Sequence, residues 1–205
     1  MTEERKDWEK VVAFHGHSCP GLAVGFRAAR IALRELAAER DVDEELVAVV
    51  ENDACGVDAV QVLTGCTFGK GNLWFRDYGK HVFTFFCRNS GRGVRIAVKG
   101  SLWREDDPDF QELREKVFSG TAEPEEKERF RRLQEERTRH ILTMPEGEFC
   151  TVQAVQEEIP PKAKIFRSLT CAFCGEQVAE HRARWREGRP ACIPCAQEPE
   201  KGCKC

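Results

Sequence analysis

The sequence contains no apolar run that approaches the ~18 residues a membrane-spanning helix requires. Its first ten residues, MTEERKDWEK, are charged and lack the apolar core of an export signal. The formal net charge is only −3, so the chain as a whole is not an obvious binder of polyanions. Internal repeats and low-complexity tracts are also absent. We therefore expect a globular cytoplasmic protein that has no membrane partner.

Cysteine, in contrast, is abundant, with eleven residues in a chain of 205. Without an export signal, metal ligation or thiol chemistry is more typical than a disulfide framework. Four of these cysteines form two close pairs, Cys171-x-x-Cys174 and Cys192-x-x-Cys195, separated by residues 175–191. This spacing is typical of a structural zinc site, in which four thiolates converge on one tetrahedral ion. The sequence therefore predicts a zinc module near its C-terminal end.

Pro160-Pro161 marks the boundary between two predicted domains, residues 1–160 and 161–205. In the first domain, apolar residues at helical spacing predict a helix from Pro20 to about Arg40. A buried strand is expected at 46–50 and a short helix at 56–64, followed by three strands of an antiparallel meander at 71–76, 81–88 and 94–99. Two charged helices, one opening at 107–108 and one at 123–142, then precede a last strand at 149–156. This pattern predicts an α+β fold, with helices packed on a mostly antiparallel sheet.

A second cluster of potential metal ligands precedes the first of these helices. His15-Gly16-His17-Ser18-Cys19 places two imidazoles and a thiol within five residues, where the helix begins. The positive end of a helix dipole lowers the pKa of a thiol, which would make Cys19 a better ligand or nucleophile. Cys55, within Asp53-Ala54-Cys55-Gly56-Val57-Asp58, lies at a similar strand-to-helix junction.

These two junctions can form one site if they lie side by side. His15, His17, Cys19 and Cys55 would then bind a transition metal through mixed nitrogen and sulfur ligands. Asp53 or Asp58 would orient a histidine from outside the ligand set. The alternative is structural: two loop histidines, a buried thiol, and aspartates that only cap helices. The Gly-rich segment 65–72 lacks the spacing of a phosphate-binding P-loop, although its amides could still bind an anion.

Three motifs together resemble the FmdE family, that of the E subunit of formylmethanofuran dehydrogenase. They are FHGHSCPG at 14–21, NDACGVDAVQ at 52–61 and LTGCTFGKGN at 63–72. The resemblance covers roughly residues 8–155. It implies an α+β core domain that dimerises and often carries a C-terminal zinc finger of the treble-clef type. It also implies a core metal site at His15, His17, Cys19 and Cys55. Asp53, Asp58, Gln61 and Cys66 would lie nearby, and with the two cysteine ligands they are the candidate catalytic residues.

The family enzyme reduces carbon dioxide on methanofuran with a molybdenum or tungsten pterin held in other subunits. The resemblance therefore implies a redox-associated accessory protein, with a second copy or redox-enzyme subunits as partners. We expect a structural zinc and a second transition metal, zinc or iron, in the core site.

Two other functions are compatible with the sequence. The zinc module carries nine Lys and Arg against five Asp and Glu over residues 161–205, which is compatible with a regulator that binds nucleic acid or protein. Five residues carry this interpretation: Arg182, Arg184, Trp185, Arg186 and Arg189. Cys19, activated by a neighbouring histidine, would instead make a cysteine-nucleophile enzyme. Cys203 and Cys205 add two thiols that could bind a soft metal or join a partner's site.

Overall fold

The structure is a computed structural model that describes residues 2–103 and 108–197, so Cys203 and Cys205 lie outside the described residues. The chain divides into two compact units, Met1–Lys162 and Ala163–Cys205. In the part of the chain that is described, no helix combines the length and the apolar character needed to cross a membrane.

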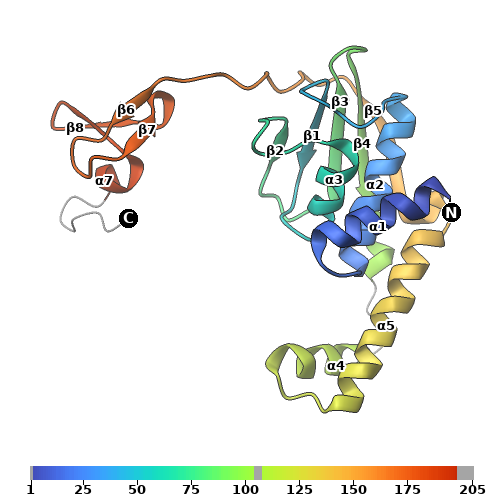
Figure 1. Ribbon diagram of the computed structural model, residues 1–205. Coiled ribbons are helices and arrows are strands. Elements are labelled where there is room, and N and C mark those ends of the chain that lie inside the picture. Colours follow the sequence, from blue (N-terminus) through green and yellow to red (C-terminus); the bar gives the residue numbers. More distant parts are fainter. Residues whose placement is uncertain (1, 104–107, 198–205) are drawn as a thin grey trace. The chain divides into compact units, whose positions relative to one another are not determined.

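The first unit contains a five-stranded sheet with the order β2-β1-β3-β4-β5 (Figure 1). Its strands are Leu46–Val50 (β1), Leu73–Phe75 (β2), Val82–Cys87 (β3), Arg92–Val98 (β4) and Cys150–Val155 (β5). All neighbouring pairs are antiparallel except β1 and β2, which are parallel. The mixed fold with a mostly antiparallel sheet is as predicted. The predicted meander is wrong for its first strand, because β2 does not pair with β3. Strand β1 lies between them and is buried along its whole length.

Three helices pack around the apolar core of this unit: α1 (Glu3–His15), α2 (Pro20–Leu36) and α3 (Gly56–Thr64). Helix α2 is the most buried of them, and the cluster that it shares with α3 and the sheet is the main core. It ends at Leu36, before the predicted Arg40, because Ala37 adopts a left-handed conformation with φ 49°. Helix α1 was not predicted, since its sequence is highly charged and it buries only Val11.

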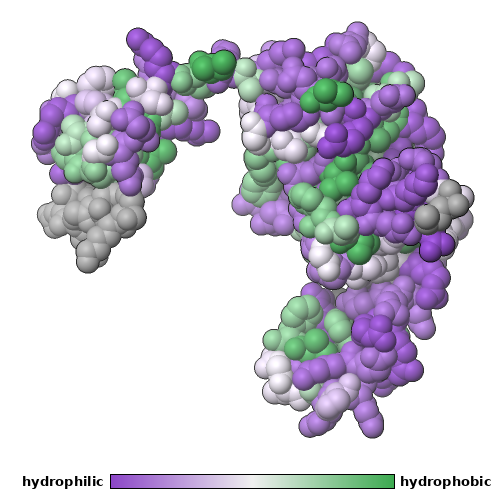
Figure 2. All heavy atoms as spheres, in the orientation of Figure 1, coloured by the Kyte–Doolittle hydropathy of each residue, from purple (hydrophilic) through white to green (hydrophobic). Residues whose placement is uncertain are grey.

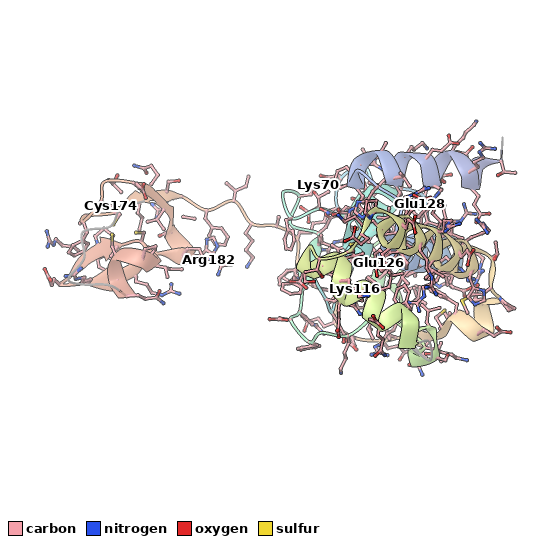
Figure 3. The ribbon with its side chains drawn as sticks, turned by 90° about the horizontal axis from the view of Figure 1, so that it is seen from below. Lys70, Lys116, Glu126, Glu128, Cys174 and Arg182 are labelled. Atoms are coloured by element: carbon pink, nitrogen blue, oxygen red, sulfur yellow. The ribbon has the colours of Figure 1, made fainter. Side chains whose placement is uncertain are left out.

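The remaining helices of the unit include α4 (Pro108–Ser119) and α5 (Pro124–Thr143), which together we call the helical arm (Figure 1). The C-terminal end of α5 packs on α2, and its N-terminal part pairs with α4. The Phe110 and Phe130 rings stack there, with centroids 5.5 Å apart. Lys116 on α4 forms an ion pair with Glu126 on α5 at 2.8 Å (Figure 3). A 3₁₀ turn (η1, Gly100–Trp103) precedes the arm, and the short helix α6 (Glu146–Phe149) follows it.

The second unit consists of two small hairpins and a short helix. The hairpins are β6 (Ser168–Thr170) with β7 (Gln177–Ala179), and β8 (Arg184–Arg186) with β9 (Arg189–Ala191). A 3₁₀ turn (η2, Glu180–Arg182) joins the two hairpins, and α7 (Ile193–Gln197) follows β9. Among the described residues of this unit, the buried apolar ones are Cys171, Ala191, Cys192 and Cys195, with Phe173, Cys174, Val178 and Ala196 partly buried against them. Three of the four buried residues are potential metal ligands, so little apolar surface other than the thiols stabilises this unit.

Candidate metal centres

The core cluster is formed where three helices meet. Helix α1 ends at His15, Cys19 is the N-cap of α2, and Cys55 immediately precedes α3. The ligand atoms of these three residues all lie within 4.8 Å of one another. The distance from Cys19 Sγ to His15 Nε2 is 3.9 Å, close to the ~3.6 Å edge that typical Zn–S and Zn–N bond lengths give in a tetrahedral site. The donor set therefore fits a transition metal held by one imidazole and two thiolates.

Two glycines bring Cys19 and Cys55 together. A Cβ atom at Gly25 of α2 would lie 1.9 Å from the carbonyl oxygen of Gly56 in α3. One turn earlier, a Cβ atom at Gly21 would lie 3.3 Å from Cys55 Cβ. Because neither position carries a side chain, the two helices touch through their backbones. Their N-terminal ends, and the cysteines placed there, therefore lie side by side.

His15 is held in place by a carboxylate on α3. Its Nδ1 lies 2.7 Å from Asp58 Oδ2, and the other carboxylate oxygen of Asp58 accepts a hydrogen bond of 3.3 Å from Gln61 Nε2. A carboxylate on one ring nitrogen fixes the tautomer, so the other nitrogen is free to bind a metal. In His15 this other nitrogen, Nε2, is the one near Cys19.

We expect Asp58→Asn to weaken metal binding at the core site by about tenfold or more, because the charged partner of His15 is lost. Competition of the protein with a chromophoric chelator for Zn²⁺ measures the affinity. Asp53→Asn is the matched control, since Asp53 is exposed and three residues before the first turn of the same helix. Equal affinities for the two variants would show that Asp58 does not support the ligand.

His17, Cys66 and Asp53 lie outside the cluster. His17 is exposed, with its ring centroid 4.5 Å from that of His15, and its nitrogens do not join the group of ligand atoms. Gly16 ends α1 in a left-handed conformation, which turns the chain away from His15 before His17. Cys66 is fully buried beyond the opposite end of α3. A nine-residue helix rises about 14 Å, so Cys66 cannot share a metal with Cys55.

The expected lowering of the Cys19 pKa is also wrong. Burial raises the pKa of this thiol to about 11, although the backbone N–H of Leu22 donates to its sulfur at 3.4 Å. Desolvation of the thiolate therefore outweighs the amides at the start of the helix. A metal that binds Cys19 must displace this proton and supply the positive charge that the thiolate needs.

The Gly-rich segment 65–72 uses its polar groups internally. The Thr67 amide donates to Asn72 Oδ1 at 2.9 Å, and the Lys70 amide donates to Thr67 Oγ1 at 3.2 Å. The Lys70 ammonium pairs with the buried Asp41 carboxylate, which also accepts from Asn72 Nδ2 at 2.8 Å. This network holds the loop beside β1 and leaves those amides committed within the fold. We therefore assign these groups a structural role, and anion binding by other amides of the loop stays a prediction.

The second cluster contains Cys171, Cys174, Cys192 and Cys195, whose sulfur atoms all lie within 4.8 Å of one another. The first two are in the turn between β6 and β7, and the other two flank the start of α7. The sulfur atoms of Cys174 and Cys192 are 3.8 Å apart, the edge expected of a tetrahedron with Zn–S bonds of about 2.3 Å. The Cys192 amide donates to Cys171 Sγ at 3.3 Å and lowers the pKa of that thiol to about 6.

Several arginines of this unit make contacts within it. The guanidinium groups of Arg186 and Arg189 lie 4.5 and 4.7 Å from the ring centroid of Phe173. Arg186 also donates to the Cys195 carbonyl at 3.0 Å, next to the metal cluster. These contacts give two of the arginines a local role in closing the module, while the Trp185 side chain is 74% exposed.

Comparison with known proteins agrees with this geometry. The family model described as FmdE, Molybdenum formylmethanofuran dehydrogenase operon, matches residues 14–151, which include the three motifs and the core cluster. The chain belongs to the FmdE family. A second model, the prokaryotic dksA/traR C4-type zinc finger, matches residues 164–201 and includes all four cysteines of the second cluster. This FmdE-family chain therefore carries a metal-binding, C4 zinc-finger module after its core.

The proteins that are similar to this FmdE-family chain include one curated relative and one solved structure. A probable S-adenosyl-L-methionine-binding protein of Archaeoglobus fulgidus is 35% identical over 189 residues, which cover 89% of this chain and 50% of that protein. The chain thus spans half the length of this relative. The crystal structure of a tungsten formylmethanofuran dehydrogenase FmdE-like protein from Syntrophus aciditrophicus matches with a TM-score of 0.62 and 24% identity. The match covers 96% of this chain and 93% of that one, and it shows a shared fold.

Proposed function

We propose that this protein is a redox-associated accessory protein that holds a transition metal, zinc or iron, at His15, Cys19 and Cys55. The observation that carries the proposal is the convergence of these ligand atoms within 4.8 Å, beside the Asp58 carboxylate that orients His15. Two cysteines and one histidine around an open fourth position are a ligand set of catalytic zinc sites. When bound, such a metal would act as a Lewis acid on a substrate oxygen.

Family membership supports the rest of the proposal. We infer that the protein works in the cytoplasm as a homodimer or beside the other components of a redox enzyme, as the resemblance to the FmdE family implies. The second unit would be a treble-clef finger, because a cysteine-bearing turn, a hairpin and a helix supply its parts in that order. Its zinc would be structural, since four thiolates leave no open position.

The test is the metal content per chain of anaerobically purified protein, with wild type beside Cys55→Ser. We expect two metals in the wild type and one in the variant, because the serine hydroxyl does not replace a thiolate ligand. Cys87→Ser is the matched control, since Cys87 lies at the end of β3 outside both clusters and should leave two metals bound. One zinc in both the wild type and Cys55→Ser would contradict the core metal site.

The cysteine-nucleophile function is less compatible with the site. A nucleophilic cysteine reacts as the thiolate, whereas burial raises the pKa of Cys19 to about 11. The histidine nearest to Cys19 has its other nitrogen bonded to Asp58, as in a metal-ligating histidine. The raised pKa favours a ligand over a nucleophile, whereas the His15–Asp58 pair would serve either role.

A further inference from the structure

A cleft of about 1280 Å³ lies between the core cluster and the helical arm. One part of its lining is Cys19 and Cys55 themselves, together with His17. The arm supplies another wall from both α4 and α5, and Figure 2 shows apolar residues gathered on the arm near α4. The cleft is therefore lined both by the potential metal ligands and by side chains of α4 and α5, which lie outside the three sequence motifs.

The charge of the cleft favours an anion. Among its described lining residues, four Lys and Arg side chains face one carboxylate; they are Lys99, Arg114, Arg131 and Arg137 against Glu148. Arg131 is compensated by two glutamates of its own helix. Arg137 forms no ion pair with a carboxylate of the described residues, and its guanidinium lies 3.3 Å from the ring centroid of Phe110. Its positive charge is therefore available to a ligand.

The shape and the hydrogen bonding of the same wall narrow the ligand class. The Phe110 ring is buried beneath the Arg137 guanidinium. The aromatic surface open to the cleft is therefore that of Phe118, which is 76% exposed and packs edge-to-face on Phe130 with centroids 6.3 Å apart. One turn before Arg137 on α5, the side-chain oxygen of Gln134 is buried and has no hydrogen-bond partner within the described part of the chain. A buried acceptor without a partner destabilises the protein. A ligand that donates an N–H or O–H to Gln134 would remove this destabilisation.

We propose that the cleft binds a small organic anion with a planar conjugated ring and a hydrogen-bond donor. The acid group pairs with Arg137, the ring lies against Phe130 and the exposed Phe118, and the donor bonds to Gln134. A ligand bound in this way shares the cleft with Cys19 and Cys55. The ligand class does not depend on the proposed function. Only the role of the ligand does, because the proposed metal at Cys19 and Cys55 would contact the bound ligand in the cleft.

The experiment uses 6-hydroxy-2-naphthoate as the probe, titrated into the full chain and followed by its fluorescence. We expect the probe to bind at least tenfold more tightly than 6-(aminomethyl)-2-naphthol, which has the same ring and hydroxyl but carries the opposite charge. Arg137→Gln should weaken binding about tenfold, because the variant loses a charge-assisted hydrogen bond to the acid group. Arg139→Gln is the matched control, since Arg139 is exposed on the same helix and is not part of the cleft.

Two further comparisons make the outcome decisive. Removing the hydroxyl, with 2-naphthoate as the probe, should weaken binding to the wild type but not to Gln134→Leu. Equal affinities for the anion and the amine, or equal losses in Arg137→Gln and Arg139→Gln, would overturn the ligand class. Wild-type protein that holds two metals and does not bind the probe would also overturn it, while the proposed metal function would stand. Binding to Cys55→Ser that has lost its core metal would support the ligand class without the metal.

Discussion

Cys174→Ser is expected to unfold the zinc module and to leave the thermal transition of the first unit unchanged. In the part of the module that the structure describes, the buried apolar residues are three cysteines and one alanine, so hydrophobic burial alone cannot stabilise it. Binding of a structural zinc supplies about 10–16 kcal/mol in isolated fingers, and the loss of one of four thiolates removes much of that energy. The first unit keeps its own large core.

Amide NMR spectra measure this effect residue by residue. In Cys174→Ser, the signals of residues 168–197 should collapse to the narrow range of an unfolded chain, while those of the sheet β1–β5 stay in place. Figure 3 places Cys174 in the module, and Cys87→Ser again serves as the cysteine control. A single cooperative loss of both sets of signals would show that the two units do not fold independently.

Gly25→Ala is expected to destabilise the first unit and to abolish metal binding at the core site. The added methyl group would overlap the backbone of Gly56, with its carbonyl oxygen at 1.9 Å and its Cα at 2.4 Å. Alanine gains about 1 kcal/mol of helix propensity, but overpacking against backbone that cannot yield costs about 3 kcal/mol or more. The net loss of about 2 kcal/mol corresponds to a fall in melting temperature of roughly 6 °C.

Thermal unfolding followed by circular dichroism, with metal content measured on the same samples, checks this prediction. Gly69→Ala is the control, since a Cβ there meets no atom within 4 Å. Gly21→Ala is a milder variant, because its Cβ would only press on Cys55 Cβ at 3.3 Å. We expect it to fold normally and to bind the core metal more weakly. Normal stability and two metals in Gly25→Ala would show that α2 and α3 can separate without disturbing the ligands.

The features that could be predicted from the sequence are those encoded within short stretches of chain. The spacing of Cys171, Cys174, Cys192 and Cys195 identifies one metal cluster because nearby ligands need little of the fold to converge. The N-terminal positions of Cys19 and Cys55 could be predicted from Pro20 and from the end of β1. Their adjacency could only be stated as a condition, because it depends on the Gly25–Gly56 contact between segments about thirty residues apart.

Other parts of the site had no local signal. The choice of Asp58 over Asp53 depends on a contact with His15 across 43 residues. His17 was expected to be a ligand from its spacing and from the family resemblance, but the chain turns at Gly16 and His17 lies outside the group of ligand atoms. The walls of the cleft come from charged helices whose sequence indicates only a solvated face. The parallel pairing of β2 with β1 also had no local signal. It depends on the position of β1 between β2 and β3 in the sheet, and turn residues do not specify that position.

The two clusters differ in whether the fold around them depends on the metal. Cys19 and Cys55 lie at the ends of helices already fixed by the buried residues of α2, α3 and the sheet, so their geometry exists before an ion arrives. A metal that binds there incurs no cost of ordering the chain, and it can leave without unfolding the domain. In the second unit the ion replaces the missing core and stays for as long as that unit is folded. If the core site holds the metal proposed above, one protein would carry a permanent metal and an exchangeable one, and only the occupancy of the exchangeable site would follow the supply of metal around it.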